Sequence, residues 1–250
     1  MRKEAKSLTY ITIAFILISI LSSLAIAKTT ITKPIIFSLA ILIPSVYLLI
    51  KFKNEPNSKD LIISLILANA GGLYGMVRAD YFSGPLVIGM VMSGYMGAVS
   101  VFRKYVPGNK IIRTNYIKSI GLGVILGLVL GYINIKLAGI SNNPVLTPDA
   151  IAMALYAGIW EEVGIRFILY ALAIYILKGE AKTKYEKFLI YTIMVAPHVL
   201  AHGIMGLDSF VCLILLFGLP MSILQRKVDL TSAIIVHTLV DLIRFVYLGI

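Results

Sequence analysis

The sequence predicts an all-α, polytopic integral membrane bundle of about eight to nine transmembrane helices. Its 250 residues are 59% hydrophobic and only 14% charged, with a mean hydropathy of +0.91, whereas soluble domains are only roughly half apolar. Apolar runs recur along the whole chain, each near the ~20 residues that a helix needs to cross the hydrocarbon core. Charged residues mostly fall between these runs, so no segment is left over for a soluble domain.

The apolar runs define nine candidate spans, with boundaries placed to within about 2 to 4 residues. The spans are residues 8–27, 34–50, 60–78, 82–102, 117–138, 150–177, 188–206, 208–225 and 231–249. The loops are short, and the chain has no internal repeat or low-complexity tract. We therefore predict a single membrane domain over residues 1–250. In it, residues 1–140 form accessory helices and residues 150–249 carry the polar motifs.

The basic residues predict the orientation of these spans. On alternate sides of the spans lie 17 and 5 Lys and Arg residues, and Arg166 is inside a span. Because basic loops stay in the cytoplasm, the amino terminus is predicted to be cytoplasmic and the carboxyl terminus to lie outside, in the cell membrane of a prokaryote. The formal charge of +11 thus indicates topology and contact with anionic lipid headgroups, not binding to nucleic acid.

Three local features of the sequence involve small residues: a possible cleavage site, a glycine pattern and the single cysteine. Residues 25–27 resemble a signal-peptide cleavage site, but the length of the preceding apolar run favours an uncleaved first helix; cleavage would leave eight spans. Gly123, Gly127 and Gly131 recur four apart and predict close packing of helices in lipid. The single Cys212 lies in the apolar run VCLILLF, which favours a packing role.

The stretch GIWEEVGIRF, residues 158–167, places two carboxylates and a guanidinium inside a span. Glu162 precedes Arg166 by four residues, so on an α-helix the two share a face and form an ion pair that offsets their burial. Glu161 has the apolar Ile165 at the corresponding position, which indicates an unpaired carboxylate suited to proton transfer. The alternative is that all three charges only lock helices together.

All three histidines fall in the later spans. His198 and His202 lie four apart after a proline, on one helix face; this spacing occurs in zinc sites, although the HExxH form is absent. In the last span, His237 and Asp241 again share a face and Arg244 follows. Asp241 would either orient the His237 ring or pair with Arg244. Ionisable residues inside a membrane mark a functional site, so these motifs are predicted to converge.

The order E-E-x-x-x-R, a histidine element and H-x-x-x-D resembles the CPBP intramembrane proteases. These include the type II CAAX prenyl endopeptidases and Abi-like bacteriocin-processing or immunity proteins. The resemblance runs from Trp160 to Asp241 and implies an intramembrane endopeptidase. It implies that Glu161 is the general base and that Glu162 and Arg166 support it. It implies that His202 is the second-motif histidine. His237 with Asp241 would form the third motif, which stabilises the oxyanion or supports the catalytic groups.

Two departures from the family pattern leave alternatives open. The family has phenylalanine four residues before the second-motif histidine, where this chain has His198. Either His198 is an additional polar ligand, or it is itself the catalytic histidine in place of His202. Asp241 stands where the prenyl endopeptidases have asparagine. An ionised aspartate cannot donate to an oxyanion, so that duty falls to His237 unless Asp241 is protonated.

A metal-free glutamate protease without cofactor is the expected chemistry. If zinc binds instead, the predicted ligands are Glu161, His202 and His237. The expected partners are the lipid bilayer and a membrane-embedded or lipidated peptide, such as a prenylated CAAX-type tail. Two rival functions stay open: a non-catalytic membrane immunity or scaffold protein of the same fold, and a proton-coupled carrier, for which the typical inverted repeats are missing from the sequence.

Overall fold

The computed structural model describes residues 2–25, 32–77, 83–108, 115–140, 143–203 and 206–249, and all regular structure in these ranges is helical. The helices are α1 (Lys3–Ala25), α2 (Thr32–Lys51), α3 (Ser58–Val77), α4 (Ser83–Tyr105), α5 (Tyr116–Leu137), α6 (Pro148–Ile159), η1 (Trp160–Phe167), α7 (Ile168–Leu177), α8 (Lys184–Ala201), α9 (Leu207–Leu213), η2 (Ile214–Gly218), α10 (Leu219–Lys227) and α11 (Leu230–Leu248). The predicted all-α fold is confirmed.

In two places, consecutive elements form one continuous helix, here called a rod, whose helical type changes along its length. The π-helix η1 joins α6 to α7, and the π-helix η2 joins α9 to α10. The described ranges therefore hold nine continuous helical rods, whose ends agree with the nine predicted spans to within five residues. The expectation of an α-helix through residues 158–167 is wrong, because Trp160–Phe167 adopts the wider π form. Such π turns inside α-helices are frequent at functional sites.

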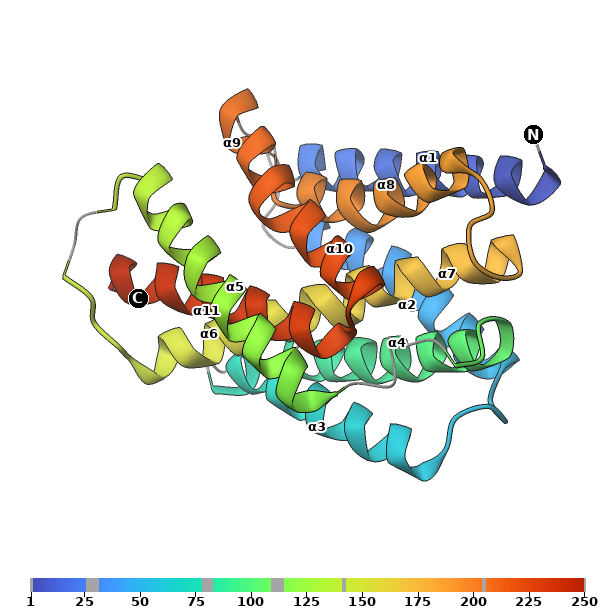
Figure 1. The fold of residues 1–250 in the computed structure, drawn as a ribbon, viewed down its shortest axis with the longest axis horizontal. Coiled ribbons are helices and arrows are strands. Elements are labelled where there is room, and N and C mark those ends of the chain that lie inside the picture. The colour runs from blue at the N-terminus through green and yellow to red at the C-terminus, as the bar shows by residue number, and fades with distance from the viewer. Residues whose placement is uncertain are drawn as a thin grey trace.

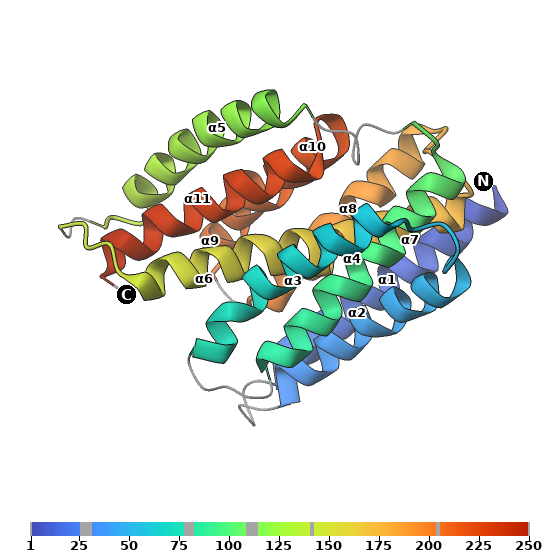
Figure 2. The same ribbon diagram turned by 90° about the horizontal axis from the view of Figure 1, so that it is seen from below.

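The rods pack side by side with η1 at the centre. Helix α1 lies along α8 and α2 along α4, and α3 packs on both α4 and α6 (Figure 1). Seen from below, α11 lies between α5 and α6 (Figure 2). The π-helix η1 contacts α4, α8 and α11. Three separate helices are thus held against the segment that carries the charged motif.

The glycines of α5 allow the close approach of α11. Gly123, Gly127 and Gly131 are all buried in α5. A Cβ at Gly123 would lie only 2.9 Å from Ile235, and one at Gly127 only 2.8 Å from Leu239. Real Cβ atoms do not approach so closely, so the predicted role of these glycines in helix packing is confirmed.

Polar contacts join the rods at both ends of the bundle. At one end they are Arg2 with Glu186 at 2.6 Å, Arg103 with Asp60 at 2.9 Å, and Ser119 with Asp229; at the other they are the Ser23 hydroxyl with the Leu200 carbonyl, and the Val145 N–H with the Val246 carbonyl at 2.8 Å. The first set lies at helix ends that flank the lysine-rich loops. Successive rods therefore run in opposite directions.

Five helices within the described residues are long and apolar enough to cross a membrane: Lys3–Leu24, Gly84–Tyr105, Tyr116–Leu137, Leu207–Lys227 and Leu230–Leu248. A shorter apolar helix spans Ile36–Lys51. Large apolar side chains, among them Ile43 and Ile125, are exposed on the outer faces, as a surface in contact with lipid requires. The chain is an integral membrane helical bundle, but five candidate spans fall short of the predicted eight to nine.

Candidate active site

The charged motif lies in η1, near the middle of the rod that runs from Pro148 to Leu177. Glu162 and Arg166 are completely buried, and the Arg166 guanidinium donates to the Glu162 carboxylate. The predicted ion pair is therefore confirmed, even though the backbone is a π-helix. The Glu161 side chain is 16% exposed, which leaves it accessible from a cavity.

A glycine in the preceding turn lets α11 approach this segment. A Cβ at Gly158 would lie 2.9 Å from the backbone nitrogen of Thr238, which cannot move aside like a flexible side chain. This close approach places His237, the residue before Thr238, beside the motif. His237 Nδ1 lies 2.6 Å from Glu162 Oε1. Glu162 thus binds Arg166 on its own helix and His237 on α11.

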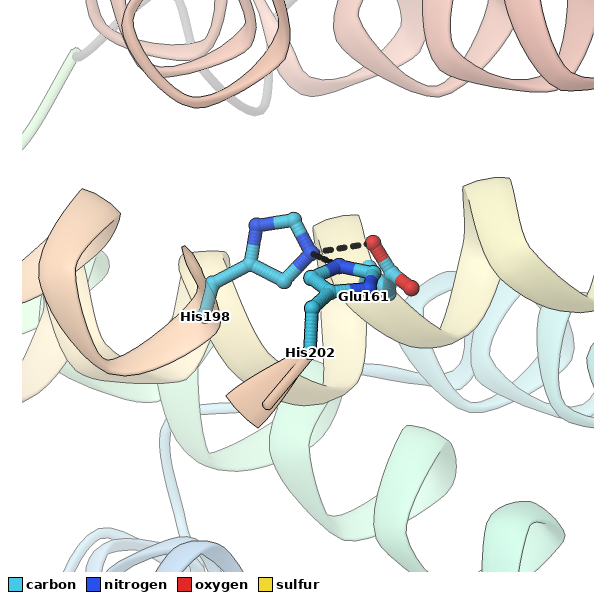
Figure 3. A group of neighbouring side chains, drawn as sticks. All are labelled: Glu161, His198 and His202. Carbon is cyan, nitrogen blue, oxygen red and sulfur yellow. Dashed lines mark hydrogen bonds and ion pairs between the residues drawn. The ribbon is translucent and has the colours of Figure 1, made fainter. Parts of the chain in front are cut away.

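His198 of α8 contacts both charged faces of η1. Its Nε2 faces the Glu161 carboxylate (Figure 3). Its Nδ1 faces the Arg166 guanidinium. Arginine can only donate, so Nδ1 must accept, and the proton of a neutral His198 ring lies on Nε2, directed at Glu161. His198 is 2% exposed.

His202 lies one helical turn further on, at the end of α8, and is exposed. Its Nε2 is 3.1 Å from Nε2 of His198, and its ring packs edge-on against the His198 ring (Figure 3). No contact of His202 with Arg166 or Glu162 occurs among the described residues. Of the two registers left open by the sequence, the geometry puts His198 in the centre and His202 at its edge.

His237 also faces the carboxylate of Glu161 and that of Asp241. Its Nε2 lies 3.4 Å from Glu161 Oε2 and 3.4 Å from Asp241 Oδ2. Of the two roles considered for Asp241, contact with the His237 ring is present. An ion pair with Arg244 does not occur in the part of the chain that the structure describes.

Residues 143–243 match the family model described as type II CAAX prenyl endopeptidase Rce1-like. This segment is similar to the Rce1-like family. The match includes Glu161, His198 and Asp241 and agrees with the CPBP resemblance of the motifs. The Rce1-like family is a family of proteases, so the match supports a protease. No curated protein and no solved structure matches the chain.

Two cavities meet at Glu161, His198 and His202 of the matched segment. The larger, of about 530 Å³, also reaches His237 and Asp241 and extends between α5, α9 and α11. The smaller, of about 300 Å³, extends toward α1, α2 and α4, where apolar residues such as Phe37 and Val87 line it. Helices outside the matched segment thus complete the walls of the site.

Three side chains of the matched segment have the composition of a metal site. Ligand atoms of Glu161, His198 and His202 all lie within 4.8 Å of one another (Figure 3). The zinc set expected from the sequence has His237 where this group has His198. The Nε2 of His198 would have to bind the ion with its lone pair, yet Arg166 directs the ring proton to that same atom.

Sequence reasoning missed two residues at this site and misplaced a third. Gln225 of α10 donates from Nε2 to the Glu162 carbonyl at 3.0 Å and so holds η1; only its polarity within an apolar stretch signals this. Asn134 of α5 lines the larger cavity. Cys212, expected to be a packing residue, is exposed and lines the same cavity, so that expectation is wrong.

Proposed function

We propose that this chain is an intramembrane endopeptidase that hydrolyses a peptide bond of a membrane-associated substrate with Glu161 as general base. One observation carries the proposal: a cavity-facing carboxylate at the centre of the bundle is contacted by two histidines from two other helices. Those histidines are in turn held by the buried pair of Glu162 and Arg166. This arrangement of base, orienting groups and buried support is typical of hydrolytic sites.

The reaction needs one water molecule next to Glu161. Glu161 removes a proton from the water as its oxygen attacks the carbonyl carbon, and the carbonyl oxygen becomes an oxyanion. His198, with its Nε2 proton, orients the Glu161 carboxylate. His237 donates its Nδ1 proton to Glu162, so it stabilises the oxyanion as a doubly protonated ring, with the second proton on Nε2. Glu161 then passes its proton to the leaving nitrogen, and the carbon–nitrogen bond breaks to give a carboxylic acid and an amine.

We favour His198 over His202 as the second catalytic residue, because His198 touches Glu161 and Arg166 and is buried. We also favour a mechanism without metal. The hydrogen bond from Arg166 uses the Nδ1 lone pair of His198 and leaves Nε2 protonated, which supports water activation by a carboxylate over binding of zinc.

The substrate that best suits the site is a peptide attached to the membrane, such as a lipidated CAAX-type tail. The smaller cavity, with walls that are mostly apolar, suits an apolar side chain or lipid close to Glu161. The larger cavity carries polar groups at Glu161, His198, His237 and Asp241, which suits the peptide and the attacking water.

We further propose that all nine rods lie in the membrane, with the amino terminus in the cytoplasm. The helix ends that flank the lysine-rich loops would then face the cytoplasm. The larger cavity extends to Ala138, Asp208 and Arg244, at or near the opposite ends of α5, α9 and α11. With this orientation the site opens toward the outer face, and its substrate is reached from outside the cell.

Replacement of Glu161 by glutamine tests the proposal, because the amide keeps the shape of the side chain and cannot act as base. Membrane peptides and lipidated tails are compared by mass spectrometry between cells with the wild type and cells with Glu161→Gln. An uncleaved peptide should accumulate in the variant, whose thermal stability should match the wild type. A non-catalytic scaffold predicts no change in the peptides, and cleavage retained by Glu161→Gln would refute the role of this residue.

A further inference from the structure

A third cavity, of about 220 Å³, shares no lining residue with the two cavities that reach Glu161. Its walls come from α3 and α4 on one side of the rod that contains η1, and from α5 and α11 on the other side (Figure 2). Its only polar groups among the described residues are the hydroxyls of Tyr95, Tyr116 and Thr231. The other lining side chains are aliphatic or phenylalanine, so the cavity suits an apolar chain and not an ion.

The cavity occupies one half of the membrane. Leu67 lies nine residues from the start of α3, whereas Tyr95 and Phe167 each lie ten residues from the ends of α4 and α7. These three helix ends flank the lysine-rich loops. At about 1.5 Å per residue the cavity extends no more than about 15 Å from those ends, which is half the thickness of the hydrocarbon core. A lipid of the adjacent leaflet, cytoplasmic in the proposed orientation, reaches the same depth.

The cavity opens to the outer surface at Tyr116, the first residue of α5. The Tyr116 side chain lines the cavity and yet is 59% exposed. Exposed aliphatic side chains continue along both flanking helices, among them Ile66 of α3 and Ile120 of α5. Tyrosines at the end of a membrane helix lie at the level of the lipid headgroups. The opening therefore faces lipid.

A free lysine lies one helical turn beyond the cavity, toward the headgroups. Lys59 precedes Ile63 by four residues and Leu67 by eight, so all three share one face of α3. Lys59 is exposed and has no hydrogen bond or ion pair with any described residue. The neighbouring Asp60 is buried and accepts from Arg103 at 2.9 Å, which leaves the charge of Lys59 unopposed. An apolar cavity beside a free cation is complementary to an anionic amphiphile.

We propose that this cavity binds an anionic phospholipid of the cytoplasmic leaflet, with one acyl chain against Phe167 and the phosphate at Lys59. Phe167 is fully buried, follows Arg166 in η1 and stacks on Phe102 with 5.4 Å between the ring centroids. On α11 the same chain contacts Ile234, which also lines the cavity.

The bound lipid touches the two elements that carry the charged residues of the site, η1 and α11, without reaching Glu161. Because it binds the folded protein between these elements, it should stabilise their packing. It is neither substrate nor reactant, so the inference does not rest on the proposed function.

The test uses a phosphatidylglycerol that carries a photoactivatable diazirine in one acyl chain. The full chain is placed in vesicles of phosphatidylcholine with a small fraction of this lipid, and the labelled peptides are identified by mass spectrometry. We expect labels to concentrate on the segments that line the cavity, around Tyr95, Phe167 and Ile234. Phosphatidylcholine with the same diazirine chain should label them about fivefold less, the effect of one lysine on an anionic headgroup.

Two pairs of variants test the acyl chain and the headgroup separately. Leu67→Trp fills the cavity and should abolish the concentrated labelling, whereas Leu65→Trp, on the same helix but outside the cavity, should keep it. Lys59→Gln should lower labelling by phosphatidylglycerol to the level of phosphatidylcholine. Lys187→Gln, which removes an exposed lysine of α8, should have no effect, because α8 contributes no residue to the cavity.

Labels spread evenly over the outer apolar faces would refute the site. Equal labelling by the two lipids, or a preference that survives Lys59→Gln, would refute binding of the headgroup, and this surface variant stays informative if Leu67→Trp does not fold. Displacement of the label by a prenylated tail peptide would assign the cavity to the substrate and overturn the inference. Thermal unfolding gives a second readout: phosphatidylglycerol should raise the midpoint of the wild type and of Leu65→Trp, and an equal rise in Leu67→Trp counts against the site.

Discussion

Glu162 Oε1 lies 2.6 Å from His237 Nδ1 and also accepts from Arg166, so one buried carboxylate holds a cation on its own helix and an imidazole on α11. Its backbone carbonyl is bound in addition by Gln225 of α10. Glu162 therefore connects three helices at the centre of the bundle. The neighbouring Glu161 instead faces the cavity and is partly exposed there.

We predict that Glu162→Gln and Glu161→Gln differ in their effects on stability. Glu162→Gln leaves the buried Arg166 without its anion, and loss of one partner of a buried pair lowers the free energy of unfolding by about 3–5 kcal/mol. Glu161→Gln should unfold close to the wild type. Thermal unfolding in detergent measures both, and equal stability of the two variants would contradict the structural role of Glu162.

Substitutions at the two histidines of α8 should differ in their effect on the rate of cleavage. His198→Ala removes the ring that contacts Glu161 and Arg166 and should lower the rate of cleavage by at least about 100-fold. His202→Ala removes an exposed ring that contacts His198 at the edge of the site and should cost a few-fold at most. Initial rates on one tail peptide provide the comparison. A larger loss from His202→Ala would reverse the assignment.

The approach of α11 to η1 should depend on Gly158. In Gly158→Ala, the added Cβ meets the backbone of Thr238 and pushes α11, with His237, away from Glu162. Such overpacking costs about 1–3 kcal/mol, and activity should fall with it. Gly121→Ala is the control, because no atom lies within 4 Å of its Cβ. It should be neutral or stabilise α5 by up to about 1 kcal/mol, and equal effects of the two variants would argue against the close approach.

The direction in which the site opens can be read from Cys212. This only cysteine of the chain is exposed and lines the larger cavity. A thiol reagent that cannot cross membranes should label it in intact cells. Cys212→Ser is the control without a thiol and should not be labelled. Lys53→Cys, introduced into Cys212→Ser, places an exposed thiol after α2, near the predicted cytoplasmic face. That control should react only after lysis. Labelling of Cys212 only in lysed cells would invert the proposed orientation.

Removal of metal should leave the activity unchanged. Purified protein is analysed for zinc and assayed before and after dialysis against a chelator. We expect less than one zinc per chain and the same rate of cleavage, since Nε2 of His198 carries the ring proton. Zinc bound one to one, with activity lost on its removal and restored by its return, would replace the carboxylate mechanism with a metal-dependent one.

Local patterns in the sequence were sufficient to predict the helices and one ion pair. The length of each apolar run predicted a helix, because a chain in lipid must satisfy its backbone hydrogen bonds internally. The spacing of Glu162 and Arg166 predicted their pair because four residues separate neighbours on a helix surface. The spacing of Gly123, Gly127 and Gly131 predicted a packing face for the same reason.

Which of these residues form the site depends on how the helices pack together. Whether His198 or His202 meets Glu161 depends on how α8 is rotated against η1, and no spacing within α8 records that rotation. The exposure of Cys212 and of Arg244 likewise depends on a cavity that several helices enclose. The sequence by itself determined the helices, the charged residues and their order along the chain. The distances between helices, which are set by packing at residues such as Gly158, determined which of those charges meet.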